Sequence, residues 1–175
     1  MNIWHDIGEN RVNEEDFVCV IEISKGGKSK YELDKQTGML ELDRVLHASM
    51  VYPANYGFIP RTYGGDKDPL DVFVICSEPI LPMTLVRCYP VGVLYMVDGG
   101  EMDEKIVAIP FKDPHNNWIA DTTDLPKFLC KEIEHFFACY KDLEGKKTEI
   151  KEFLGRNQAR EVIKQALEGY KKAFC

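Results

Sequence analysis

The chain has 175 residues, 45% of them hydrophobic and 29% charged, a balance that predicts one globular domain over residues 1–175. Its 22 Lys and Arg against 29 Asp and Glu give a net charge of −7, which argues against non-specific binding to nucleic acid or to an anionic membrane surface. No apolar run approaches the roughly 18 to 20 residues that span a bilayer. We therefore expect neither nucleic acid nor a membrane as a partner.

The N-terminal residues and the cysteines favour a reducing compartment. The first ten residues, MNIWHDIGEN, have neither the basic nor the apolar stretch of a secretory signal, so a cytoplasmic location is expected. The six cysteines form no CxxC pair and are expected to be free thiols. The four histidines are scattered with no HxxxH, so a zinc site is not expected.

The first two thirds of the chain predict short strands separated by turns. Residues 17–23 are an apolar, β-branched run, and residues 28–33 alternate between polar and apolar side chains. Short strands punctuated by Gly and Pro favour a small closed barrel. The predicted strands are 17–23, 28–33, 39–43, 70–76, 85–97 and 105–111.

The last third of the chain changes to a helical period. Asp124 is a candidate N-cap, Pro126 suits the first turn, and Gly145 ends this first helix. Asn157 is a candidate cap for a second helix with an apolar face. The predicted fold class is α+β and mainly β, a barrel followed by two helices packed on it.

Three carboxylates crowd the segment GGDKDPLDV, at Asp66, Asp68 and Asp71. They repel one another at neutral pH, and hard divalent cations offset such repulsion well. An EF-hand loop requires Gly at position 6 and Glu at position 12. Counted from Asp66 as position 1, this chain has Asp71 and Ser77 at these positions, so an EF-hand is excluded. A solvated acidic turn remains an alternative for this segment taken alone.

A second acidic cluster, DGGEMDE at residues 98–104, separates two apolar runs and predicts a hairpin tip. Taken alone, the cluster indicates a solvated loop. If the two clusters face one another across a barrel mouth, they could hold several Mg²⁺ ions. Glu22 lies within the apolar run VCVIEIS, where a carboxylate requires either a polar cleft or a strand face open to water.

Cationic and phenolic side chains accompany these acids, and each also has an ordinary structural explanation, such as aromatic packing or a charge at a helix C-terminus. No Ser–His or Cys–His nucleophile pair is evident in the sequence. Many carboxylates with a few Lys, Arg and Tyr suit a metal-bound anionic phosphate that is attacked by water.

Residues 66–72, DKDPLDV, match the signature D-x-D-P-x-D-V, and the chain resembles the soluble inorganic pyrophosphatases of family I in their short bacterial form. Further blocks carry the resemblance from about residue 12 to the last helix: VIEIS, KYELDK, VYPANYGFIP, RCYPVGVL and HFFACYKDLE. The resemblance implies an OB-like five-stranded β-barrel with two helices. It also implies that inorganic diphosphate is hydrolysed to two phosphates by a metal-activated water.

The resemblance also implies roles for individual residues. Asp68 corresponds to the acceptor of the proton from the attacking water. The implied metal ligands are Glu32, Asp66, Asp71, Asp98 and Asp103, and the implied substrate-binding residues are Lys30, Arg44, Tyr56, Tyr140 and Lys141. Glu22, Tyr52 and Lys105 correspond to other polar residues of the site. The implied cofactor is several Mg²⁺ ions per site, with Mn²⁺ or Zn²⁺ as substitutes and Ca²⁺ as an inhibitor.

The resemblance further implies a homo-oligomer, a hexamer built as a dimer of trimers. The first predicted helix has more aromatic residues than one stripe against a barrel needs, which favours a second packing surface. The resemblance implies that His135 lies near a contact between subunits. Two alternative functions remain at this point. An OB-type module for single-stranded nucleic acid would need a basic groove. A divalent-cation buffer would release no phosphate from diphosphate.

Overall fold

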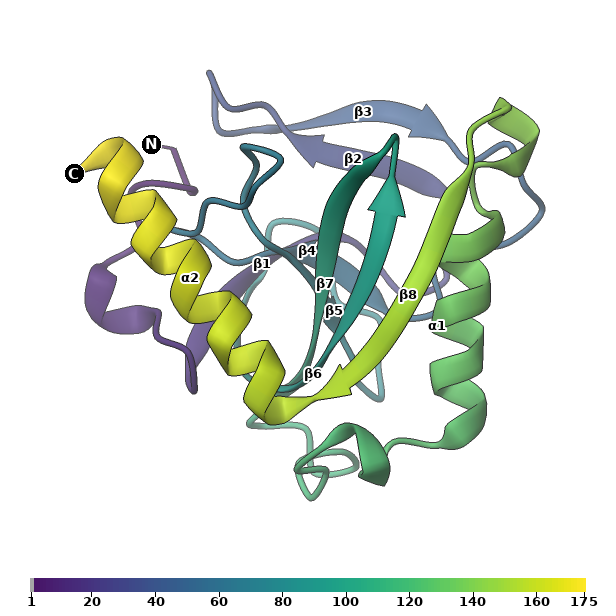
Figure 1. The fold of residues 1–175 in the computed structure, drawn as a ribbon. Coiled ribbons are helices and arrows are strands. Elements are labelled where there is room, and N and C mark those ends of the chain that lie inside the picture. The colour runs from purple at the N-terminus through teal and green to yellow at the C-terminus, as the bar shows by residue number, and fades with distance from the viewer. Residues whose placement is uncertain (1) are drawn as a thin grey trace.

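The computed structural model describes residues 2–175, which form eight strands and two longer helices (Figure 1). Three short 3₁₀ turns complete the regular structure of these residues. In chain order the elements are β1 (Phe17–Ile23), β2 (Ser29–Leu33), β3 (Leu40–Val45), β4 (Asn55–Phe58), β5 (Asp71–Val74), β6 (Leu85–Asp98), β7 (Glu101–Pro110), α1 (Lys127–Cys139), β8 (Thr148–Gly155) and α2 (Arg156–Phe174).

Five strands close into a barrel in the order β1-β4-β5-β7-β6, because β6 also pairs with β1. Only the β5–β7 pair of this ring is parallel, and β8 extends the sheet beyond β6. The strands β2 and β3 form a separate hairpin, which lies beyond one end of the barrel (Figure 1). The predicted class, a mainly β five-stranded barrel with two helices, is confirmed.

The turn between β6 and β7 explains how the second acidic cluster is held. Gly99 and Gly100 both have positive φ, 59° and 87°, as a tight two-residue hairpin turn requires. Asp98 therefore pairs with Glu101 at the hairpin tip, and Asp103 pairs with Met96 further along the strand. The expected hairpin is present, and it places Asp98 and Asp103 at the same end of the barrel.

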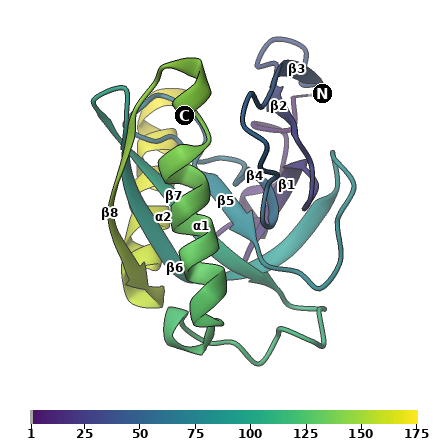
Figure 2. The same ribbon diagram turned by 90° about the vertical axis from the view of Figure 1, so that its right-hand side faces the viewer.

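The two helices pack on different apolar clusters. α1 buries Ile133, Phe136 and Phe137 against the cluster that contains Tyr52 and Phe73. α2 packs its small and branched side chains on a second cluster beneath β6 and β7. Figure 2 shows the two helices on opposite sides of β6, β7 and β8. Within residues 2–175 no helix has both the length and the hydropathy that crossing a membrane requires.

Both predicted helix starts were wrong by a few residues. Asp121, rather than Asp124, caps a short 3₁₀ turn through the backbone N–H of Thr122, and α1 begins only at Lys127, after Pro126. α2 begins at Arg156 directly after β8, so Asn157 lies inside the helix. The strands β4 and β8 were not predicted.

Asp113 joins the turn after β5 to the turn after β7. Its buried carboxylate accepts hydrogen bonds from the backbone N–H of Ser77 at 2.8 Å, from His115 N–H at 3.1 Å and from Asn116 Nδ2 at 2.7 Å. Burial alone would raise its pKa, but these donors outweigh burial and hold the pKa at about 2.

We expect Asp113→Asn to destabilise the protein by about 2 kcal/mol at pH 7, because the ionised carboxylate is the better acceptor. A depressed native pKa stabilises the fold above the unfolded-state value of 3.8, and this contribution disappears as the pH falls through about 2. Urea unfolding between pH 7 and pH 2 measures the difference. Glu161→Gln, at an exposed position of α2, is the control. If the difference in unfolding free energy between the wild type and Asp113→Asn is as large at pH 2 as at pH 7, the role given to the ionised Asp113 carboxylate is wrong.

Candidate active site

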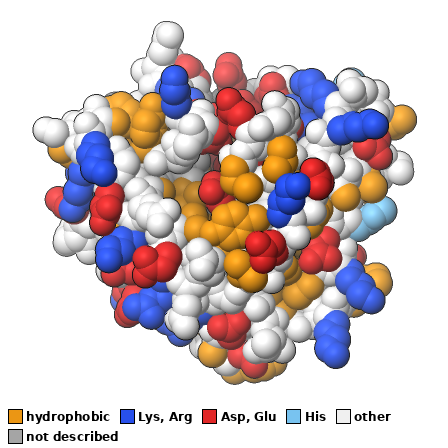
Figure 3. Space-filling model, viewed as in Figure 1, with side chains coloured by type: hydrophobic (Ala, Val, Ile, Leu, Met, Phe, Trp, Pro, Cys, Tyr) orange, Lys and Arg blue, Asp and Glu red, His pale blue; other side chains and the backbone are white. Residues whose placement is uncertain are grey.

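A cleft of about 270 Å³ opens at the barrel end that carries the β6–β7 turn. Its walls come from β1, β2, the segment between β4 and β5, the β6–β7 hairpin and the end of α1. Figure 3 shows acidic side chains gathered in the upper part of this face, where the surface is hollowed. Its charged and phenolic lining residues are Glu22, Lys30, Tyr31, Glu32, Lys35, Tyr52, Tyr56, Asp66, Asp68, Asp71, Asp98, Asp103, Lys105, Tyr140 and Lys141.

The fold therefore brings together thirteen of the fourteen residues that the sequence predicted for one site. The two acidic clusters face one another across the mouth of the cleft, although more than twenty residues separate them in the chain. Arg44 is the exception. Its guanidinium pairs with Asp43 and, through Nε at 2.8 Å, with the largely buried carboxylate of Glu144.

Lys105 lies at the centre of the cleft and is only 4% exposed. Its Nζ lies 2.5 Å from Asp71 Oδ2 and 2.9 Å from Asp103 Oδ2, and donates to the Tyr56 hydroxyl at 3.1 Å. The parallel register of β5 and β7, which pairs Asp71 with Lys105, makes this arrangement possible. Burial would lower the pKa of Lys105, but the two carboxylates and Tyr56 raise it well above the usual value.

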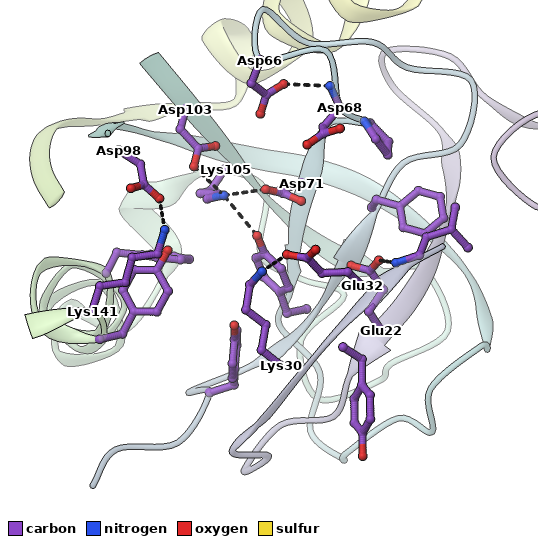
Figure 4. A pocket seen from close by; sticks show the side chains of 18 of the residues that line it. Glu22, Lys30, Glu32, Asp66, Asp68, Asp71, Asp98, Asp103, Lys105 and Lys141 are labelled. Atoms are coloured by element: carbon purple, nitrogen blue, oxygen red, sulfur yellow. Dashed lines mark hydrogen bonds and ion pairs between the residues drawn. The ribbon is translucent and has the colours of Figure 1, made fainter. Parts of the chain in front are cut away.

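The other three lysines of the cleft also pair with carboxylates, and Figure 4 shows the pairs made by Lys30 and Lys141. Lys141, just after α1, pairs with Asp98. Lys30 pairs with Glu32 and lies 3.4 Å from Asp43. Lys35, in the turn after β2, pairs with Asp68, and the sequence analysis missed it. The only signal for Lys35 was its place at the end of the KYELDK block.

A short loop holds Asp66 and Asp68 toward the cleft. The Asp66 carboxylate accepts the N–H of Asp68 at 3.0 Å, and the Asp68 carbonyl accepts the N–H of Gly64 at 2.8 Å. Lys67 between them has a φ of +68°, a left-handed conformation. Residues 64–68 therefore form a compact unit with internal hydrogen bonds.

Burial and the neighbouring negative charge of Asp71 make three acidic groups of the cleft, Glu22, Asp66 and Asp103, harder to ionise. Burial, with the neighbouring Asp71 charge, raises the pKa of Asp66, and burial also raises that of Asp103. Glu22 is 6% exposed, and burial together with Asp71 raises its pKa to about 8 despite a hydrogen bond from Leu33 N–H at 2.9 Å. Positive charge brought into the cleft would therefore be bound strongly.

The tyrosines supply neutral donors at the same place. Burial raises the pKa values of Tyr52, Tyr56 and Tyr140, so that all three stay protonated at physiological pH. A neutral phenol can donate one hydrogen bond to an anionic oxygen. The cleft thus combines carboxylates with lysine and phenol donors. An anionic ligand that binds together with metal ions needs both, the carboxylates for the metal ions and the donors for its own oxygens.

The donor set fits hard divalent cations. Mg²⁺ and Ca²⁺ prefer carboxylate oxygens, and five aspartates and Glu32 border one cleft. Within residues 2–175, no three carboxylate, His or Cys side chains converge tightly enough to coordinate an ion as they stand, because lysines lie among the carboxylates. A cation would bind by exchanging with a lysine at a shared carboxylate.

Fold and site together define a β-barrel protein with a carboxylate-rich cleft suited to divalent cations and phosphate. The family model described as inorganic pyrophosphatase matches residues 19–171, so the chain belongs to the inorganic pyrophosphatase family. It is 43% identical, over 98% of its length and 89% of the relative's, to soluble inorganic pyrophosphatase 2 of Chlamydomonas reinhardtii.

Solved structures agree with this assignment. An inorganic pyrophosphatase from Helicobacter pylori has a TM-score of 0.88 at 42% identity, covering 91% of this chain and 95% of that one. The inorganic pyrophosphatase from Thermus thermophilus has a TM-score of 0.91 at 35% identity, covering 98% of this chain and 99% of that one.

We expect Lys105→Met to destabilise the metal-free protein by about 3–5 kcal/mol, because it removes a buried cation and leaves the partly buried carboxylates of Asp71 and Asp103 without a partner. Denaturant unfolding in EDTA measures this. Lys171→Met is the matched control, because Lys171 pairs with Glu9 at 2.6 Å on the exposed surface and such pairs contribute little. Equal losses in the two variants would contradict the central role of Lys105.

Proposed function

We propose that this cleft hydrolyses inorganic diphosphate to two phosphates with the help of divalent cations. The observation that carries the proposal is the convergence of the two acidic clusters and three flanking lysines on one cleft in a member of the inorganic pyrophosphatase family. Diphosphate is a compact polyanion, so its binding site needs cations on both of its phosphoryl groups. The cleft offers lysines directly and carboxylates that can hold metal ions.

The proposed metal ligands are Glu32, Asp66, Asp71, Asp98 and Asp103, and Mg²⁺ is the proposed cofactor, with Mn²⁺ or Zn²⁺ as substitutes. Bound divalent cations would polarise the phosphoryl oxygens and would lower the pKa of a bound water, so that this water could lose a proton near neutral pH. The proposed ligands are supported by their chemistry, because all of them offer carboxylate oxygens and Mg²⁺ prefers oxygen ligands.

Asp68 is the proposed proton acceptor. It is half-exposed at the cleft, with a flexible lysine as its partner, so water can reach its carboxylate. Water oxygen bonds to one phosphorus as the bond from that phosphorus to the bridging oxygen breaks. One proton of the water passes to Asp68 and from there to the leaving phosphate, while the other stays on the newly formed phosphate, so that no covalent enzyme intermediate forms.

Substrate oxygens are assigned to Lys30, Lys141, Tyr56 and Tyr140, all of which line the cleft. Lys30 and Lys141 come from opposite sides, from β2 and from the end of α1. Arg44 is proposed as a further phosphate-binding group, and it would have to leave Glu144 to act. Tyr52 and Glu22 lie deeper and support this set.

The protein is also proposed to assemble as a homo-hexamer in the cytoplasm. α1 presents Phe128, 72% exposed, and the following segment presents Leu143, 70% exposed. His135 and Cys139 lie on one side of α1, with Nδ1 and Sγ 3.7 Å apart. The thiols of all six cysteines are free, as a reducing compartment would keep them.

Sedimentation at pH 7 should give a species about six times the mass of the 20.1 kDa chain, and a monomer would refute the proposed hexamer.

Purified protein with Mg²⁺ should release phosphate from diphosphate, and Asp68→Asn should lower kcat by about 100-fold or more, because the proton acceptor is lost. Phosphate release measured under saturating diphosphate gives both values. The control is Asp16→Asn, whose carboxylate pairs with Arg87 away from the cleft. Absence of Mg²⁺-dependent release by the wild type would favour a cation-binding protein without catalysis.

Ca²⁺ should inhibit the reaction that Mg²⁺ supports. Ca²⁺ is larger, accepts six to eight oxygens at about 2.3–2.6 Å and acidifies water less than Mg²⁺ does. It can therefore occupy the aspartates without supplying the chemistry. Initial rates in mixtures of the two cations measure the effect, and hydrolysis with Ca²⁺ alone at the Mg²⁺ rate would refute the argument.

A further inference from the structure

The N-terminal segment, residues 2–5, lies against the base of the loop that carries Asp66 and Asp68. In Figure 1 the N-terminal segment lies beside the C-terminal end of α2. Trp4 is 4% exposed and packs with Leu33, Phe58 and Tyr170 in a cluster separate from the two main cores. This segment precedes the part of the chain that the family model matches, and no role in catalysis has been given to it above.

Trp4 makes three contacts with the base of the loop. Its indole Nε1 donates to the Thr62 carbonyl at 2.9 Å, and its own carbonyl accepts the N–H of Arg61 at 3.0 Å. Its ring stacks on Tyr63 with the centroids 6.2 Å apart. Thr62 is fully buried, so its carbonyl has no access to water in place of the indole.

The C-terminal helix closes the same contact from the other side. Tyr63 N–H donates to the Ala166 carbonyl of α2 at 2.9 Å. A Cβ on Gly169 would lie 2.8 Å from the Tyr63 carbonyl, so loop and helix approach as closely as a glycine permits. Phe174 completes the packing, 5.2 Å from the rings of both Trp4 and Tyr63.

The segment also contacts the turn that follows β2. Asn2 Nδ2 donates to the Lys35 carbonyl at 2.7 Å, in the turn that follows β2. Lys35 Nζ lies 5.8 Å from the centre of the Trp4 ring and pairs with Asp68. Residues 2–5 therefore contact both of the elements that meet at Asp68.

Residues 64–68 have their backbone hydrogen bonds among themselves, whereas residues 61–63 are held from outside the loop by Trp4 and α2. The Thr62 hydroxyl also links the base of the loop to the barrel, because it donates to the Ile59 carbonyl at 2.5 Å and accepts the N–H of Leu70 at 2.8 Å. The compact unit can therefore be displaced as a whole if its base moves. We propose that Trp4 is a positioning residue, which through Thr62 and Tyr63 fixes the direction in which Asp66 and Asp68 face the cleft. This inference rests on the proposed role of those two aspartates.

The chain provides its own matched control. Its two tryptophans, Trp4 and Trp118, each donate Nε1 to a backbone carbonyl, Trp118 to His115 at 3.0 Å, but Trp118 is 64% exposed and lies away from the cleft. Trp4→Phe keeps the ring and removes one hydrogen bond to the loop. Trp118→Phe removes a similar bond elsewhere.

Isothermal titration with Mg²⁺, without diphosphate, measures metal affinity directly. Trp4→Phe should weaken the Mg²⁺ Kd about fivefold, the worth of one hydrogen bond, and lower kcat with little change in KM. Trp118→Phe should change neither value. A lowered melting temperature in Trp4→Phe with unchanged Kd and kcat would make Trp4 merely structural and overturn the proposal.

A second measurement does not depend on how Trp4→Phe folds. In Trp118→Phe, Trp4 is the only tryptophan, and its emission should shift as Mg²⁺ binds, with the Kd found by titration calorimetry. Emission that saturating Mg²⁺ leaves unchanged would contradict the coupling. If Mg²⁺ binds and shifts the emission but wild-type protein releases no phosphate from diphosphate, the proposed function fails while the positioning role stands.

Discussion

The architecture of the cleft depends on one buried cation, Lys105, held between Asp71 and Asp103. Two carboxylates this close in a poorly solvated cleft repel each other, and each would be driven to protonate. The lysine removes that penalty, because its charge is shared by two acceptors and the hydroxyl of Tyr56. The parallel pairing of β5 with β7 sets Lys105 beside Asp71, so the fold itself supplies this countercharge.

The remaining acids are placed by turns rather than by strands. The Gly99–Gly100 turn brings Asp98 to the tip of the longest hairpin, and the loop before β5 brings Asp66 and Asp68 to the same barrel end. Because turns are held locally, their direction relative to the barrel must be fixed by contacts at their base. For the loop that carries Asp66 and Asp68, the two ends of the chain supply part of those contacts, and the Thr62 hydroxyl supplies others to Ile59 and Leu70.

The sequence predicted strongly patterned elements well and weakly patterned ones poorly. The apolar run of β1 and the long hairpin of β6 and β7 have clear patterns. β4 has only four residues, one of them Gly57, and it begins two positions after a proline, so its sequence has no strand pattern. A Cβ at Gly57 would lie 1.8 Å from the Val20 carbonyl, so a residue that weakens the strand pattern is required by close pairing with β1. β8 is an edge strand with exposed charges, which hides its period.

For the site, residue types were predictable but pairings were not. The motif at residues 66–72 identified its acids, yet nothing local indicated that Lys35 would reach Asp68 or that Arg44 would turn toward Glu144, since both contacts join distant segments.

The charge balance of the cleft is itself an argument about its ligand. Seven carboxyl groups face four lysines, and even with Glu22 protonated, as its pKa of about 8 requires at neutral pH, the lining stays net negative. Such a cleft repels a bare polyanion. Under the proposed function, divalent cations on the carboxylates would allow the cleft to accept diphosphate, and each of these cations would free a lysine for a phosphate oxygen. The same ion pairs that stabilise the cleft would therefore make binding of the substrate conditional on binding of the metal.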